Sequence, residues 1–598
     1  MIRNVAEEYR SRKAGASAEF ERSWSRMQAA RLLFLGGAVA TVVLVLDSMR
    51  HGLSAAWFAV AALVSIAALI MMLWQMERSS AANRRVSFYE RSLARLSGEE
   101  PNSGFTGEAF AREGHIFQED LNVLGKDSLF DRLATTRTTV GQRGLAKLLL
   151  DPATTAIARE RQAAVRELSL NVDLQERVAL LGRSKFEDVP ADSLEQWLAG
   201  ERHGFGSWLR WVLPAITLAW LTIGTLGMLH RMDTHLLLRN VGVLIGLQGL
   251  LCLRVRAVVN REMEAARSLF GQTIILREGL RLLRTQIFTA SMLTRLQLQA
   301  AGEDKALAGL ERWLAVVEQR PKEWFYPLSL ALCLGTHAGI ALEQWRAEFS
   351  EPMRRWLSAW ADFEALVAVG TYAAEREGDA YPELVNSADD EHGIFAAVKL
   401  KHPLLPRETA VANDVSLGGV PQFLLISGSN MAGKSTLLRA VGASAVLALA
   451  GAPVAAQSLQ LGIDGIGASL SVSDSLSEGK SKFLAEVERL RAIVELARSQ
   501  PGRTLFLVDE ILAGTNSLDR KAAAESVLHA LVKAGGIGAI STHDLTLTSI
   551  AELPGLHGLN VHMASPEEDD PLAFDYKLKP GINPTTNALA IVRMMGLG

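Results

Sequence analysis

The chain of 598 residues is too long for one compact hydrophobic core, so we expect several domains. Its formal net charge of -3 excludes a globally basic surface, and any contact with nucleic acid has to come from a local patch. The two cysteines, Cys252 and Cys333, lie in apolar runs without the spacing of a metal knuckle or a disulfide framework. We interpret both as buried small hydrophobic residues.

The first predicted elements are two apolar runs that form a helical hairpin, residues 32–46 and 53–76. A membrane-spanning helix needs about 20 apolar residues, a length that the first run reaches only with residues 27–30 included and Arg31 snorkelling. Arginines flank the hairpin on both outer sides, so the positive-inside rule places both ends in the cytoplasm. A cleaved signal peptide is the competing interpretation of the first run, but no small-residue cleavage pattern follows it.

A second pair of apolar runs, residues 211–230 and 236–253, is joined by a short turn. Arg239 interrupts its second member, and basic residues flank the pair. We predict a second transmembrane hairpin with cytoplasmic ends, the alternative being a buried helical hairpin of a soluble domain. A further apolar stretch, 324–342, contains Pro327 and would be an odd fifth span, so we predict a core helix there instead.

Long helical patterns fill the regions between and after the hairpins, at 117–182, 254–298 and 345–376, and we interpret them as struts or levers. A polar break at 377–391 marks the last boundary. After it, short β-like runs at 422–427, 504–508 and 538–541 alternate with helical patterns. This alternation predicts an α/β domain with a parallel-rich sheet and helices on both faces.

Residues 428–436 fit the pattern G-x-x-x-x-G-K-[ST] and stand between a strand-like and a helical segment. Glycines let the backbone curl so that amide groups point at phosphates, and the helix N-terminus adds its partial positive charge. Lys434 would bridge the outer phosphates, and Ser435 would supply a hydroxyl to Mg²⁺. The predicted ATP-binding residues of this P-loop are Gly428, Ser429, Asn430, Met431, Ala432, Gly433, Lys434, Ser435 and Thr436.

Two carboxylates, Asp509 and Glu510, follow an aliphatic strand-like run. We expect Asp509 to share the magnesium shell with Ser435, and Glu510 to orient and deprotonate the attacking water. His543 comes directly after a third strand-like run, where its imidazole can lie near the terminal phosphate. Each feature alone is common and mostly structural, but together with the loop they predict hydrolysis with Glu510 and His543 as catalytic residues.

Ser481 precedes a predicted helix with an apolar face at 483–494, so it stands at a helix N-terminus suited to an anion. No phosphate in its own subunit needs a second such site. We therefore interpret Ser481 as acting in trans on the terminal phosphate held by another subunit, with Asp519 lining the same dimer interface. The alternative is a helix N-cap without a ligand.

With these residues in view, the last third of the chain resembles the MutS family of mismatch-repair ATPases. The motifs occur in the family's order, with Lys482 where a threonine is common. They are Asn413 and Asp414, residues 428–436, Asp509 to Ile511 with Gly514 and Thr515, Ser541 to His543, residues 574–578, and Ser481 to Phe483 with Glu486. Residues 129–150 and 165–178 resemble, more weakly, the start of the family's core lever domain.

The resemblance implies a homodimer that closes composite ATP sites through its ATPase domains. The implied roles are ATP binding at residues 430–436, Mg²⁺ at Ser435 and Asp509, hydrolysis through Glu510 with His543, and completion in trans by Ser481. The chain also departs from the family. We find no mismatch-reading domain before the lever, no C-terminal extension, and Ala410 where an aromatic residue commonly stacks on adenine.

We therefore predict a membrane-anchored, dimeric MutS-like ATPase, multi-pass in the cytoplasmic (inner) membrane, with its ATPase domain in the cytoplasm. Nucleotide closure would move helical levers rooted in the bilayer. The expected segments are a cytosolic N-terminal segment (1–28), transmembrane hairpin 1 (29–76), the helical core's first part (77–205), transmembrane hairpin 2 (206–254), an all-α lever and core region (255–390) and the P-loop ATPase domain (391–598).

Two alternatives stay open, with DNA as a candidate ligand. The first is a DNA mismatch-repair or DNA-clamp protein that binds mismatched or branched DNA, for which the arginine-rich segment 254–295 is the candidate basic patch. On a long helix such charges are commonly a solvated face. The second is a transporter-like membrane ATPase, although four spans with very short external turns leave little room for a substrate pathway.

Overall fold

The computed structural model describes residues 4–51, 55–98, 104–182, 193–200, 204–206, 208–267, 269–385, 394–429, 431–470, 482–512, 517–564 and 574–583. The chain divides into two compact units. Unit 1 comprises Met1–Thr135, Ala146–Leu180 and Leu366–Gly598, and unit 2 comprises Thr136–Leu145 and Leu181–Ala365.

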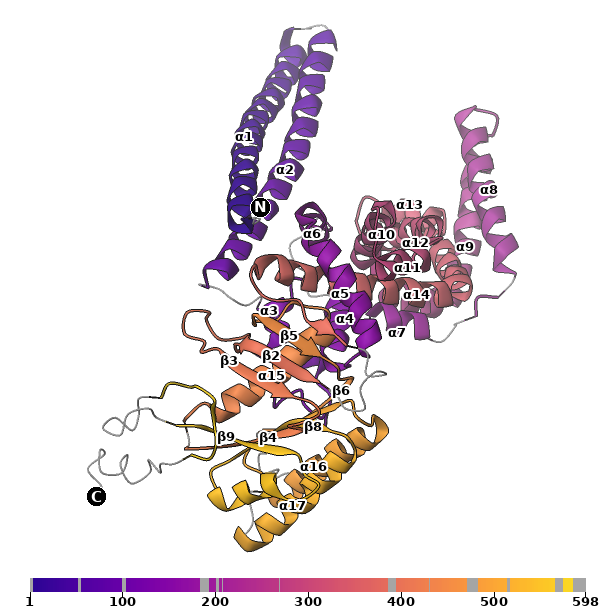
Figure 1. Ribbon diagram of the computed structural model, residues 1–598. Helices are drawn as coiled ribbons and strands as arrows, with labels where there is room; N and C mark the ends of the chain where they lie inside the picture. The colour runs from indigo at the N-terminus through magenta and orange to yellow at the C-terminus, as the bar shows by residue number, and fades with distance from the viewer. Residues whose placement is uncertain are drawn as a thin grey trace, which may run out of the picture. The chain divides into compact units, whose positions relative to one another are not determined.

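Unit 1 begins with two long helices, α1 (Val5–His51) and α2 (Ala55–Ser97), which lie side by side as a hairpin (Figure 1). A Cβ atom on Gly37 would lie 2.5 Å from Ser65 Oγ, so the missing side chain lets the helices approach closely. Apolar side chains face outward, with Leu32 70% and Leu63 65% exposed. Both helices are long and apolar enough to cross a membrane, in agreement with the predicted first hairpin.

The charged end of this hairpin packs against other helices of unit 1. Tyr9 and Tyr89 are buried with ring centroids 5.6 Å apart, in one cluster with Val172 of α6. Arg95 forms a buried ion pair with Glu375 near the end of α14. The other helices of unit 1 in this region are η1 (Glu108–Phe110), α3 (Leu129–Leu133), α5 (Thr155–Ser169) and α6 (Val172–Ala179).

The described residues of unit 2 form helices and their connections, without a strand. Two of its helices, α8 and α9, form a hairpin and are again long and apolar enough to cross a membrane (Figure 1). The predicted helical segment 254–298 is divided among three helices. The helices are α7 (Ser193–Ala199), α8 (Leu209–Met228), α9 (Thr234–Arg267), α10 (Leu269–Thr285), α11 (Ser291–Gln299), α12 (Glu303–Gln319) and α13 (Tyr326–Ala331), while α4 (Thr139–Leu150) and α14 (Leu334–Glu375) each belong partly to unit 1.

The stretch 324–342, predicted as one core helix, is interrupted. Helix α13 ends at Ala331, Cys333 adopts a left-handed φ of 50°, and α14 begins at the next residue. Ala338 and Leu342 on α14 are fully buried, whereas Trp324 is 71% exposed. The expected core helix therefore corresponds to the part of the stretch that opens α14.

The C-terminal part of unit 1 is built on a six-stranded sheet in the order β10-β9-β4-β8-β7-β6. Its strands pair in parallel except β10, which is antiparallel to β9. The predicted strands correspond to β4, β7 and β8. The strand bounds are β4 (Phe423–Gly428), β6 (Gly465–Ser469), β7 (Thr504–Val508), β8 (Ile537–Thr542), β9 (Gly558–Met563) and β10 (Lys579–Pro580).

Helices cover both faces of this sheet, as predicted (Figure 1). Helices α16 (Lys482–Ser499) and α17 (Ser517–Lys533) and the 3-10 helix η2 (Leu545–Glu552) share one hydrophobic core with β4, β7 and β8. Helix α15 (Lys434–Leu449) packs on the opposite face, where Gly442 approaches Leu507 closely. The apolar face predicted for α16 is buried at Leu490 but partly exposed at Phe483.

A smaller four-stranded sheet, in the order β1-β5-β2-β3, precedes and flanks the main sheet in the chain. Its strand β3 ends shortly before β4 and begins at Asn413, the first residue of one predicted family motif. The bounds are β1 (Glu383–Leu384), β2 (Phe395–Leu400), β3 (Asn413–Leu417) and β5 (Ser458–Leu461).

Candidate functional site

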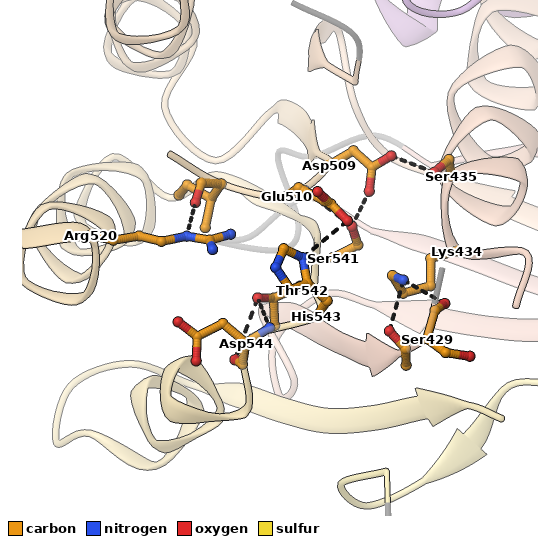
Figure 2. Close-up of polar contacts among 12 residues, drawn as sticks. Ser429, Lys434, Ser435, Asp509, Glu510, Arg520, Ser541, Thr542, His543 and Asp544 are labelled. Atoms are coloured by element: carbon orange, nitrogen blue, oxygen red, sulfur yellow. Dashed lines mark hydrogen bonds and ion pairs between the residues drawn. The ribbon is translucent and has the colours of Figure 1, made fainter. Parts of the chain in front are cut away.

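The loop that joins β4 to α15 carries the predicted lysine at its end. Lys434 is the first residue of α15, and its Nζ donates hydrogen bonds of 2.8 Å to the carbonyl oxygens of Gly428 and Ser429 (Figure 2). Burial lowers the pKa of Lys434, while Asp509 and Glu510 act in the opposite direction. The ammonium therefore lies folded back over the loop, with two acidic side chains nearby.

Two positions of the loop require glycine for reasons of space or conformation. A Cβ on Gly428 would lie 2.2 Å from the carbonyl oxygen of Met563, and Gly433 has a φ of 96°. The Oγ of Ser429 is buried and has no hydrogen-bond partner within the described residues. A compact loop with an unsatisfied hydroxyl and a buried ammonium fits the phosphate chain of a nucleotide.

Asp509 directly follows β7 and receives a hydrogen bond on each carboxylate oxygen. Ser435 on α15 donates to Oδ2, and Ser541 on β8 donates to Oδ1 (Figure 2). The predicted magnesium pair, Ser435 and Asp509, is thus brought together across the carboxyl edge of the sheet. A hydroxyl and a carboxylate are oxygen donors of the kind that Mg²⁺ prefers, so this pair fits that ion.

Glu510 lies next to the predicted histidine. Its Oε1 is 3.1 Å from His543 Nδ1, and both side chains are partly exposed. The backbone of Glu510 has a left-handed φ of 51°, and its N–H donates to the carbonyl oxygen of Ser541 at 3.1 Å. Because β7 and β8 are neighbours, the two side chains meet at the ends of adjacent strands.

The short segment after Glu510 is held by two residues of the surrounding helices. Glu486 on α16 accepts a hydrogen bond of 2.5 Å from the backbone N–H of Leu512, which also has a left-handed φ, 53°. Arg520 on α17 donates to the carbonyl oxygen of Ile511 at 2.8 Å. A non-glycine residue in this conformation is unusual and is stabilised here by these contacts.

Two contacts of this site were not predicted from the sequence. Ser541, part of a motif but given no role, binds Asp509. Tyr576 lies beside the loop, because a Cβ on Gly433 would be 2.9 Å from its Cδ1, and the residue is 44% exposed. Asn413 holds the Tyr576 segment by donating to the Tyr576 carbonyl oxygen and accepting from the N–H of Leu578. Ser541 and Tyr576 both lie in motifs that the sequence analysis identified, but the sequence did not indicate which residues they contact.

Several predicted site residues cannot be placed. Asn430 and Ser481 lie outside the described residues, as do Gly514 and Thr515. Asp519, the second residue predicted to act in trans, is exposed in the first turn of α17. Within the described part of unit 1, the structure therefore assembles the loop, the two acids and the histidine, while the interface predictions are untested.

The fold and this cluster define an α/β domain whose polar side chains gather at the carboxyl ends of parallel strands β4, β7 and β8. Residues 424–598 match the family model described as MutS domain V. The C-terminal domain of the chain is therefore similar to domain V of the MutS family.

Similar proteins agree with this assignment. The DNA mismatch repair protein MutS of Thermus aquaticus is 37% identical over 199 residues, which are 33% of this chain and 24% of that protein. The DNA mismatch repair protein MutS 2 of Halobacterium salinarum is 29% identical over 315 residues, 51% of this chain and 35% of that protein. The DNA mismatch repair protein MSH6 of Arabidopsis thaliana is 31% identical over 265 residues, which are 42% of this chain and 20% of that protein. The alignments thus span only 20% to 35% of these relatives.

Proposed function

We propose that this protein is a membrane-tethered MutS-like ATPase that acts as a homodimer and couples its nucleotide state to movement of helical levers. The observation that carries the proposal is the joint placement of Lys434, Asp509, Glu510 and His543 at one edge of the sheet. Nucleotide hydrolysis needs a lysine that binds phosphate, an acid that binds the metal ion and an acid that orients the attacking water.

In this proposal residues 428–436 bind the phosphates of ATP, and Ser435 and Asp509 hold Mg²⁺. The metal, when bound, neutralises charge on the outer phosphates. Lys434 turns from the loop carbonyls to the phosphates, and Glu510 orients the attacking water and takes its proton. His543 holds the Glu510 carboxylate, and Ser541 holds Asp509.

The adenine contact, which Ala410 leaves open, is proposed to come from Tyr576. Its exposed ring lies beside Gly433 at the base of α15, so an adenine that leaves the loop on this side would find an aromatic surface. Asn413 and Lys577 keep the segment in place, since Lys577 Nζ donates to the carbonyl oxygen of Ala412 at 2.6 Å.

Four helices support the proposed membrane tether: α1, α2, α8 and α9 satisfy the length and composition of membrane spans. Their apolar side chains are exposed to an extent unusual for a soluble surface, as at Leu250, which is 75% exposed. We propose that both hairpins enter the cytoplasmic membrane and that the ATPase domain lies in the cytoplasm.

The relatives are named as DNA mismatch repair proteins, which keeps DNA as a candidate partner. The predicted basic patch is partly neutralised, because Arg277 pairs with Asp304 and Glu311, and Arg284 pairs with Glu303. The arginines at the end of α9 directly follow an apolar span, where they equally suit a membrane interface. The observations thus favour the tether over a duplex-binding face.

The test uses the full chain purified in detergent. Binding of a fluorescent ATP analogue and Mg²⁺-dependent phosphate release are measured for the wild type, for Lys434→Ala, and for the exposed control Lys126→Ala. Loss of both signals in Lys434→Ala alone is expected, and retained nucleotide affinity would overturn the assignment of the loop. Fluorescence anisotropy with duplex, mismatched and branched DNA at low and high salt separates the DNA alternative, since phosphate contacts make binding salt-sensitive.

A further inference from the structure

The only two cysteines of the chain lie together in unit 2, although they are far apart in sequence. Cys252 is on α9, and Cys333 lies in the break between α13 and α14. Both cysteines line one small cavity of about 30 Å³. Cys333 is buried, whereas Cys252 is only partly buried.

A glutamine on the same helix fixes this arrangement. Gln248 lies one helical turn before Cys252, on the same face of α9. Its Nε2 donates to the carbonyl oxygens of Leu330 and Ala331 at the end of α13 and lies 3.2 Å from Cys333 Sγ. Its Oε1 accepts a hydrogen bond of 2.8 Å from Trp220 Nε1 on α8.

These contacts hold the helix break against α9, at the cavity that Cys252 and Cys333 share. The left-handed φ of Cys333, 50°, is unusual for a residue with a side chain and belongs to the same fixed turn. A pair of thiols held at short range by surrounding polar contacts is arranged for reaction with each other rather than with separate partners.

We propose that Cys252 and Cys333 form a reversible dithiol–disulfide site, oxidised by a hydroperoxide and reduced again by a dithiol. In the first step the Cys252 sulfur attacks the peroxide oxygen, which gives a sulfenic acid and releases water or an alcohol. In the second step the Cys333 thiol displaces water from that sulfenic acid, and the S–S bond forms. The sum is two thiols and one peroxide giving one disulfide, one water and one water or alcohol.

The order of the two steps follows from the surroundings of the thiols. Burial raises the pKa of Cys333 to about 11, so its thiolate is scarce and it suits the second, resolving role. Cys252 is the less buried of the two and lies at the basic end of the apolar run of α9, two residues before Arg254, so we assign it the first reaction with the oxidant. A reducing cytoplasm keeps such a pair reduced at rest, so the disulfide would form only under oxidative conditions.

The disulfide would change how α9 is joined to the helices that follow it in unit 2. In the reduced state Gln248 joins α9 to the end of α13 by hydrogen bonds alone. In the oxidised state a covalent bond would join α9 to the start of α14. The site thereby restricts the movement of the α8–α9 hairpin against the helical body of unit 2.

The experiment treats the full chain in detergent with hydrogen peroxide, then denatures it and labels free thiols with a maleimide polymer that shifts the band on a non-reducing gel. We expect the two thiols to be lost together, the denatured chain to run as a single chain on the gel, and dithiothreitol to restore both thiols. Mass spectrometry should find one peptide pair that links Cys252 to Cys333. Retention of both thiols, or their loss only through links between chains or irreversible oxidation, would overturn the proposal.

Single variants test the order of steps independently. In Cys333→Ser the sulfenic acid on Cys252 should accumulate and be trapped by dimedone. In Cys252→Ser trapping at Cys333 should be at least about tenfold slower, because its thiolate is scarce. Equal trapping in both variants would contradict the assigned roles. A denatured wild-type sample, in which the pair is no longer held together, serves as the control for proximity.

Discussion

Glu510 and His543 meet across adjacent strands, with Glu510 Oε1 3.1 Å from His543 Nδ1. Glu510 follows β7 and His543 follows β8, and these strands pair in parallel, so their ends lie at the same edge. Figure 2 shows the pair between the Asp509 cluster and Asp544. Glu510 is thus positioned to orient a water molecule, and the imidazole of His543 is positioned to hold the Glu510 carboxylate.

Glu510→Gln should bind ATP with near wild-type affinity and hydrolyse it about 100-fold or more slowly, because the amide cannot accept the proton of the attacking water. Phosphate release and nucleotide binding measure the two quantities, with Glu552→Gln on the exposed surface as the control. We also expect the variant to accumulate as a closed dimer at saturating ATP. A monomer in sedimentation under these conditions would count against a site completed in trans.

His543→Ala should lower the turnover number roughly tenfold or more while leaving the Michaelis constant for ATP little changed, because the histidine orients Glu510 and not the nucleotide. Steady-state phosphate release provides both constants. His557→Ala, an exposed histidine just before the start of β9 and thus at the opposite edge of the sheet, is the matched control. A large rise of the Michaelis constant with unchanged turnover would show that His543 serves binding instead.

Ser541→Ala should weaken the apparent affinity for Mg²⁺ about tenfold, because Asp509 loses the hydroxyl that orients its Oδ1. Titration of ATPase activity with Mg²⁺ measures the effect, and excess metal should restore most of the rate. Ser549→Ala, whose Oγ contacts only the carbonyl oxygen of Thr546, should behave as the wild type. An unchanged magnesium titration in Ser541→Ala would remove this residue from the site.

The membrane tether can be tested by topology. In a chain without its native cysteines, Asp233→Cys in the short turn between α8 and α9 should react with an impermeant maleimide added to intact cells. Lys126→Cys in unit 1 should react only after the cells are opened. The opposite labelling pattern, or full recovery of the protein in the soluble fraction, would contradict the proposed arrangement.

A fifth prediction concerns pH and the buried carboxyl of Glu364. It accepts hydrogen bonds from the N–H groups of Arg137 and Thr138 in unit 2, and burial raises its pKa to about 7. The folded state therefore binds this proton more tightly than the unfolded state. The stabilisation is fully present below pH 4.5 and is lost as the pH rises through 7, by about 3 kcal/mol in all.

Glu364→Gln mimics the neutral carboxyl and should remove this dependence. The unfolding temperatures of wild type and variant are measured from pH 4.5 to 8. As the pH rises, the unfolding temperature of the wild type should fall relative to that of the variant. Thr138 Oγ1, which contacts the second carboxyl oxygen, can accept from the amide of the variant. A pH-independent difference would show that Glu364 keeps the same protonation state in both forms of the protein.

The elements that depend on short windows of residues could be predicted from the sequence. The strands β4, β7 and β8, the four apolar helices and the loop with Lys434 were all predicted, because periodicity, apolar length and glycine spacing are local properties. The position of the site at the carboxyl edge of the sheet could also be predicted, because parallel strands place their carboxyl ends at the same edge. The similarity of the C-terminal domain to the MutS family was also predicted, from motifs in a fixed order.

Contacts between residues far apart in the chain could not be predicted and became visible in the folded chain. Ser541 on Asp509, Tyr576 beside Gly433, and Cys252 against Cys333 join parts of the chain that no local pattern connects. The reason is physical: such contacts depend on the order of strands in the sheet and on where helices break and cross. The strand order and the positions of the helix breaks depend on the packing of the whole chain. The conformational preference of a short segment contributes only weakly to the free energy of that packing.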